Sequence, residues 1–146
     1  MEKFIAYTDG SCDNLDPKRP GGAAYIIFNE DMTLFRKASK GFCGTTNNRM
    51  ELLAIISVVN ALPKGSEVTI YTDSQYCITT LKAKKPKMNL DLVGKYHQIA
   101  GKLAKVTFEW VRGHNGNMWN EECDRMANGE YQKIKGIFST LESLRL

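Results

Sequence analysis

The sequence predicts an α/β protein in which a mixed β-sheet is covered by helices. Three β-prone segments follow one another near the N-terminus with short connections, which is typical of an antiparallel meander. Helical and β-prone segments then alternate along the rest of the chain, which favours further strands in the same sheet. With 146 residues and 42% hydrophobic content, the chain suffices for one compact domain.

The three strands of the meander are expected at residues 3–9, 22–29 and 33–42. Each is rich in β-branched or aromatic side chains. The segment DNLDPKRPG separates the first two, and Asn29-Glu30-Asp31 separates the second from the third. Both connections have the composition of turns.

The alternating part begins with a long apolar run, RMELLAIISVVNALP, which predicts a largely buried helix that ends at Pro63. A strand at 68–73 and a short helix at 74–81 should follow. An amphipathic helix is expected at 90–105 and a last strand at 106–111, where the residues are again β-branched and aromatic.

Residues 118–131 place apolar side chains on one stripe of a helix. The following segment, KIKGIFSTLESLRL, is compatible with a further amphipathic helix, although Gly136 interrupts it. We therefore expect one domain at 1–130 and a C-terminal tail at 131–146.

Composition sets loose limits on function. A formal net charge of +4 permits a polyanionic partner without requiring one. The N-terminus lacks the features of a signal peptide, and no apolar run is long enough to cross a membrane. The four cysteines are scattered singly, without the spacing of a zinc site, so we expect reduced thiols in a cytoplasmic protein.

Four acidic residues are candidates for chemistry, and each has an ordinary structural alternative. Asp9 ends an apolar strand before Gly10, where it could simply open a turn. Glu51 lies three residues after Asn48, which is the spacing of a capping box. Its carboxylate nevertheless shares a helical face with apolar residues and points toward the sheet, where it needs a partner such as a cation.

Asp73 stands between a strand and a helix, where an N-cap is the common explanation. Strand ends are also where open α/β sheets place their sites. Asp124 belongs to a polar helix surface, and Asn120 lies one turn earlier on the same side. Taken alone, Asp124 is expected to be a solvated surface acid.

Together these residues carry a family resemblance. The segments YTDGSC at 7–12, TTNNRMEL at 45–52, YTDSQY at 71–76 and WVRGHNGNMWNEECDRMA at 110–127 resemble the signature blocks of type 1 ribonuclease H. The blocks occur in order and with family-like spacing through nearly all of residues 1–130. A single TDG or TDS would be weak evidence, whereas four blocks in order are specific.

The resemblance implies the ribonuclease H-like fold, a five-stranded mixed sheet with three antiparallel and then two parallel strands, flanked by helices. It also implies an endonuclease that hydrolyses the RNA strand of RNA–DNA hybrids. Asp9, Glu51, Asp73 and Asp124 match the family's metal-binding carboxylates, and His114 matches its mobile active-site histidine. Such a cluster needs cations to offset its mutual repulsion, and an all-oxygen ligand set favours Mg²⁺ first and Mn²⁺ second.

Two such ions about 4 Å apart would activate a water on one side of a phosphodiester and stabilise the leaving 3′ oxygen on the other. The expected products carry 5′-phosphate and 3′-hydroxyl ends. This route does not use the 2′-hydroxyl of the RNA as nucleophile, so the enzyme must recognise that group by contact. His114 is expected to handle protons or assist product release, since imidazole titrates near working pH.

Substrate contacts are also implied by the resemblance. One segment should approach the RNA strand, three amide side chains should read the minor groove, and one threonine should contact a DNA phosphate. These residues are Gly10, Ser11 and Cys12 for the RNA strand, Asn47, Asn48 and Gln75 for the groove, and Thr46 for the phosphate. Helix capping is the alternative for Asn47 and Asn48, and one residue can do both.

Two features depart from the family pattern. Many relatives carry a long basic helix and loop between the third acid and the last strand, whereas only TTLKAKKPKMNLD stands there in this chain. Its lysines are either a remnant of that DNA-gripping element or a solvated loop. Gly44 stands where relatives often have a basic residue.

There are two rival functions. One is a catalytically silent hybrid-binding module, against which all four acids are present. The other is a transposase-like or junction-resolving nuclease, whose members lack this combination of blocks. We therefore expect a monomeric, Mg²⁺-dependent ribonuclease H that acts on RNA–DNA hybrids away from membranes.

Overall fold

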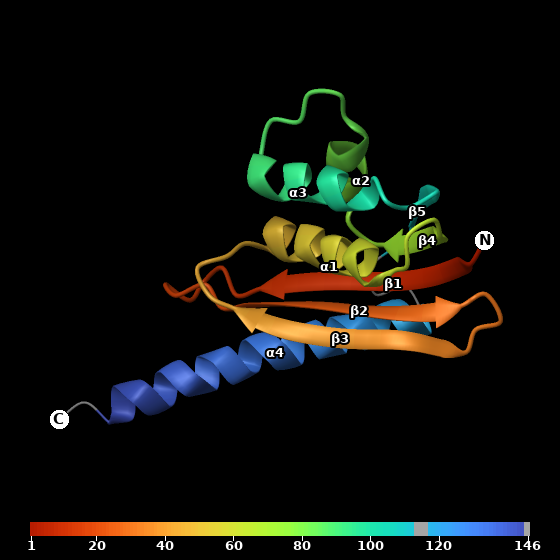
Figure 1. Ribbon diagram of the computed structural model, residues 1–146. Helices are drawn as coiled ribbons and strands as arrows, with labels where there is room; N and C mark the ends of the chain where they lie inside the picture. The colour runs from red at the N-terminus through yellow and green to blue at the C-terminus, as the bar shows by residue number, and fades with distance from the viewer. Residues whose placement is uncertain (113–116, 145–146) are drawn as a thin grey trace.

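The computed structural model describes residues 1–112 and 117–144. Its centre is a five-stranded mixed sheet in the order β3-β2-β1-β4-β5 (Figure 1). The pairs β1–β2 and β2–β3 are antiparallel, whereas β1–β4 and β4–β5 are parallel. The strands are β1 (Lys3–Cys12), β2 (Gly21–Asn29), β3 (Leu34–Phe42), β4 (Glu67–Thr72) and β5 (Lys105–Trp110). The predicted α/β fold is confirmed.

Helices cover both faces of the sheet. Helix α1 lies directly on one face with α2 and α3 stacked beyond it, and α4 crosses the other face (Figure 1). The helices are α1 (Asn47–Ala61), α2 (Gln75–Lys82), α3 (Leu90–Ala100) and α4 (Met118–Ser143). Within the described residues, no helix combines the length and apolar composition needed to span a membrane.

The interior strand β2 explains the two-sided arrangement. Its first eight residues are all buried, because alternate side chains pack against helices on opposite faces. Tyr25 and Ile27 belong to the core under α1, whereas Ile26 and Phe28 pack with Cys123 of α4. A nearly continuous apolar run, rather than a simple alternation, is what such a doubly covered strand requires.

The predicted helix at 90–105 is wrong in its C-terminal end. Helix α3 ends at Ala100, and its C-cap is Gly101. The chain then turns, and the amide of Ala104 donates to the carbonyl of Ser66 at 2.9 Å, which brings the chain back to the sheet for β5. The helical periodicity of 101–105 was overridden by this pairing with a neighbouring segment.

Helix α4 is one continuous element that includes most of the segment expected as a possibly helical tail. Its N-terminal half packs closely on β2, where a Cβ on Gly22 would lie 2.1 Å from the Ala127 carbonyl oxygen. Only glycine permits this approach. The helix then runs through Gly136 to Ser143. The division into a domain at 1–130 and a tail at 131–146 stays a prediction.

Candidate active site

Asp9 lies inside β1 and does not open a turn. The strand continues to Cys12, and Asp9 is paired with Ala24 of β2 in the antiparallel register. Its residue exposure is only 4%. The structural alternative for Asp9 therefore fails, and a carboxylate is held in the sheet interior.

Glu51 is not part of a capping box with Asn48. The N-cap of α1 is Thr46, whose side-chain oxygen accepts from the Arg49 amide at 3.2 Å. The Glu51 carboxylate instead accepts from the amide of Gly10. A Cβ on Gly10 would lie 2.4 Å from the Glu51 backbone nitrogen, so the glycine lets β1 and α1 approach closely enough for this contact.

Asp73 is not the N-cap of α2, because Ser74 takes that role with its hydroxyl accepting from the Cys77 amide. The Asp73 carboxylate is therefore not used in capping and can take part in the site. Its backbone carbonyl accepts from the indole nitrogen of Trp110 at 3.2 Å. Sequence reasoning missed this role of Trp110, although the residue opens the fourth signature block.

The three carboxylates meet at one point. One ligand oxygen from each of Asp9, Glu51 and Asp73 lies within 4.8 Å of the others. In the part of the chain that the structure describes, no Lys or Arg forms an ion pair with them. Three convergent oxygen donors with no paired cation fit a hard divalent ion.

The electrostatics of the cluster agree with that fit. Burial, together with the charge of Asp73, raises the pKa of Asp9 to about 7. Burial and the neighbouring Asp9 carboxylate raise the pKa of Glu51 well above its usual value. Both shifts mean that the ionised cluster is costly without a cation.

Asp124 approaches the same site from α4. It lies outside the group within 4.8 Å, but its charge contributes to the raised pKa of Asp9. The Asn128 side-chain amide donates to its carboxylate at 3.3 Å. The fourth predicted acid therefore lies near Asp9 and is not a distant surface residue.

The residues implied in substrate contact lie next to the carboxylates along the chain, and we call them the rim. Asn47, Asn48 and Gln75 are exposed at the beginnings of α1 and α2. Because Thr46 caps α1, the amides of Asn47 and Asn48 are not needed for that role. The Thr46 hydroxyl accepts within the cap, which leaves its hydrogen available to donate. Gly10, Ser11 and Cys12 are partly exposed at the end of β1.

A set of hydrogen bonds centred on Arg49, which we call the Arg49 clamp, joins the beginnings of α1 and α2. Sequence reasoning missed it. The Arg49 guanidinium contacts the Asp91 carboxylate through two hydrogen bonds of 3.0 and 2.7 Å. It also donates to the Asn89 side chain, whose amide donates in turn to the Tyr76 hydroxyl at 2.7 Å. Arg49 and Tyr76 lie within the second and third signature blocks, which was the available signal.

His114 lies outside the described residues, so its expected role stays a prediction.

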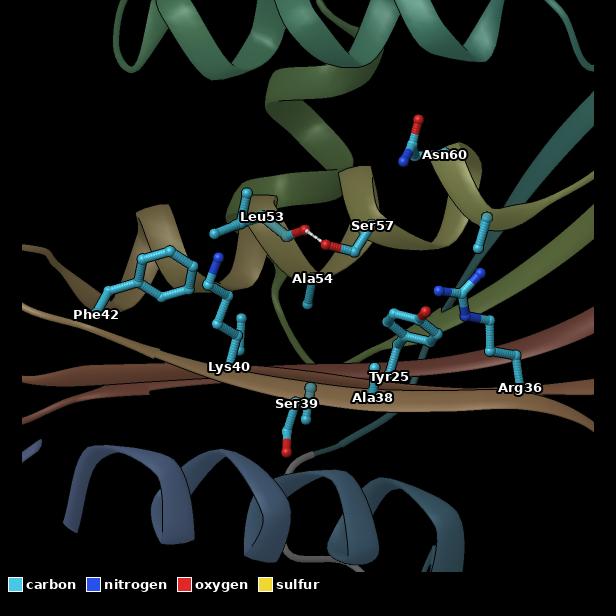
Figure 2. Close-up of a pocket in the computed structure, with 13 residues that line it drawn as sticks. Tyr25, Arg36, Ala38, Ser39, Lys40, Phe42, Leu53, Ala54, Ser57 and Asn60 are labelled. Atoms are coloured by element: carbon cyan, nitrogen blue, oxygen red, sulfur yellow. Dashed lines mark hydrogen bonds between the residues drawn. The ribbon is translucent and has the colours of Figure 1, made fainter. Parts of the chain in front are cut away.

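One pocket is excluded as the reaction centre. A cavity of 680 Å³ lies between α1 and β3, and Arg36 and Lys40 rise into it from β3 (Figure 2). None of the described residues that line it is an acid, and its lining does not include the three clustered carboxylates.

Comparisons with known proteins identify the family. A family model described as RNase H matches residues 1–132. A protein named Ribonuclease H from Trichodesmium erythraeum is 41% identical, with 90% of each chain covered. Another from Campylobacter concisus is 41% identical over 92% of this chain and 96% of the relative. The resemblance noted from the signature blocks is confirmed.

A solved structure supports the fold. The N-terminal RNase H domain of a Mycobacterium tuberculosis protein, fused to maltose-binding protein, superposes with a TM-score of 0.75. The alignment covers 91% of this chain and 96% of that chain at 20% sequence identity. At this identity the likeness concerns the fold alone.

Proposed function

The chain belongs to the RNase H family, and from that premise we propose that it hydrolyses the RNA strand of RNA–DNA hybrids with two divalent metal ions. The products would carry 5′-phosphate and 3′-hydroxyl ends. The observation that carries this proposal is the meeting of Asp9, Glu51 and Asp73 within 4.8 Å, from three separate segments of the chain. No structural role accounts for three buried or half-buried acids placed so close together.

Asp9, Glu51, Asp73 and Asp124 would hold the ions. When bound, divalent ions supply a water nucleophile at neutral pH and stabilise negative charge on the leaving oxygen. The chain itself orients the ligands. The Gly10 amide donates to both the Asp9 and the Glu51 carboxylates, which keeps the two side chains turned toward one point. Mg²⁺ is the ion proposed first, with Mn²⁺ as a substitute.

Recognition of the hybrid would fall to the rim. Asn47, Asn48 and Gln75 are exposed amides that can both donate and accept at base edges and 2′-hydroxyls. Such groups distinguish RNA from DNA without selecting a sequence. Gly10, Ser11 and Cys12 are proposed to approach the RNA strand, and the Thr46 hydroxyl to contact a DNA phosphate. His114 is proposed to handle protons or assist product release.

A strand-specific cleavage assay tests the function. RNA–DNA, RNA–RNA, DNA–DNA and single-stranded RNA, each with one labelled strand, are incubated with and without Mg²⁺. We expect cleavage of the RNA in the hybrid alone, with little sequence preference and with full inhibition by EDTA. Equal cleavage of a DNA duplex, or activity that survives EDTA, would refute the proposal. Binding without cleavage would favour the silent hybrid-binding module.

A further inference from the structure

The C-terminal part of α4 contacts the connection between β1 and β2. The family model ends at residue 132, whereas α4 continues to Ser143. Figure 1 shows these last turns running past the end of the sheet, on the side where β1 leads into β2. Residues 133–143, which we name the α4 extension, therefore lie beyond the matched part of the chain.

Contacts of two lysines join the extension to the connection. The Lys135 ammonium lies 2.8 Å from the Asp13 carboxylate. The Lys18 ammonium lies 2.8 Å from the Glu142 carboxylate and 4.3 Å from the centre of the Phe138 ring. Positions 135, 138 and 142 share one face of a helix, so a single stripe of the extension holds the connection.

The connection in turn holds the segment that leads into α1. The Gly44 amide donates to the Lys18 carbonyl at 2.8 Å, and the Thr45 amide donates to the Arg19 carbonyl at 3.3 Å. Residue 45 directly precedes Thr46, which caps α1 before the exposed Asn47 and Asn48. The contacts therefore run without interruption from the extension to the rim of the site.

We infer that the α4 extension is a positioning element for the hybrid-binding rim, acting through Asp13 and Lys18 on residues 44–48. This inference rests on the proposed function. The pairs are partly exposed, so each contributes little to the free energy of unfolding. Their effect is on the local order of the connection and of the rim, where small displacements weaken substrate contacts. Lys135 and Asp13 are thus positioning residues and have no part in the reacting cluster.

Four variants test the inference. Lys135→Met removes the cation, and Asp13→Asn removes the carboxylate charge but keeps an oxygen for the Leu15 amide, which donates to Asp13 at 3.1 Å. Lys135→Arg preserves the pair. Lys133→Met is the matched control, because Lys133 pairs with Glu130 within α4 and not with the connection.

Two measurements are made on the full chain. Amide hydrogen exchange of Gly44 and Thr45, without metal or substrate, should accelerate severalfold in Lys135→Met and Asp13→Asn only. In hybrid cleavage, KM should rise about two- to fivefold in the same two variants while kcat stays unchanged. Asp13→Asn is decisive, because a purely electrostatic effect of added positive charge would lower KM.

The outcomes separate the two proposals. Unchanged exchange in both charge-removing variants would overturn the inference, as would a lowered KM in Asp13→Asn or equal effects in Lys133→Met. Faster exchange with an unchanged KM would overturn the link to substrate binding. A wild-type chain that does not cleave hybrid would instead refute the proposed function, and the exchange rates would still report on the contacts.

Discussion

The carboxylate cluster gathers like charges in the protein interior, whereas the Arg49 clamp pairs opposite charges nearer the surface. In the cluster, burial and neighbouring acids raise the pKa of Asp9 to about 7. In the clamp, hydrogen bonds from Arg49 lower the pKa of Asp91 to about 2. The same functional group therefore destabilises the metal-free fold in one region and stabilises it in the other. Such opposed environments separate acids kept for chemistry from acids kept for structure.

The largest expected effect is on turnover. Asp9→Asn or Asp73→Asn keeps the shape of the side chain but removes much of its metal-binding charge. Losing an outer partner of a metal ligand costs roughly 10–100-fold, so losing a ligand charge should lower kcat about 100-fold or more. Hybrid binding, measured by fluorescence anisotropy, should persist. Near-normal rates would show that the reaction centre lies elsewhere.

The next effect concerns the rim that the clamp supports. Asn47→Ala combined with Gln75→Ala should raise KM more than it lowers kcat, because these amides are assigned to the groove and not to the reacting phosphate. Two hydrogen bonds of about 0.5–1.5 kcal/mol each correspond to roughly a 5- to 150-fold increase in KM. Asn60→Ala, at the far end of α1, is the control. A loss confined to kcat would assign the amides to catalysis.

The thermal stability of the metal-free protein should reveal the repulsion between the clustered carboxylates. Because the folded pKa of Asp9 is above its unfolded value of 3.8, its contribution is greatest below about pH 4 and is lost as pH rises to about 7. Asp9→Asn should therefore raise the Tm at pH 8. A gain on the order of 1 kcal/mol in the free energy of unfolding corresponds to a rise in Tm of roughly 2–6 °C.

Calorimetry at pH 4 and pH 8 provides the measurement. The Tm difference between Asp9→Asn and the wild type should vanish at the lower pH. Mg²⁺ should stabilise the wild type at pH 8 more than the variant, since a ligand stabilises the state that binds it. A variant less stable than the wild type at pH 8 without metal would contradict the assigned electrostatics.

The smallest expected effect is a decrease in Tm, opposite in sign to the effect of Asp9→Asn. Asp91 has a lowered pKa in the folded state, so its contribution is present above about pH 4 and is lost as pH falls toward 2. Asp91→Asn should lower the Tm at pH 6 slightly, since the carboxylate is exposed. Glu30→Gln, an exposed acid in the turn after β2, makes the same charge change without a clamp and should leave the Tm unchanged.

The amino-acid sequence by itself determined the order of strands and helices, because local patterns of apolar and β-branched residues encode them. It also identified Asp9, Glu51, Asp73 and Asp124 as a set, through four short blocks in order. It failed where a distant segment decided the outcome. Helix α3 stops at Ala100 because the chain must return to Ser66.

Only the tertiary structure decided which acids meet and which residues cap the helices. Asp73 and Asn48 both have the local pattern of caps, but Ser74 and Thr46 take those roles, which a comparison of neighbouring residues does not reveal. The pairing of Lys135 with Asp13 joins residues 122 positions apart. Charge pairs and shifted pKa values depend on distances in space, and a sequence specifies those distances only through the complete fold.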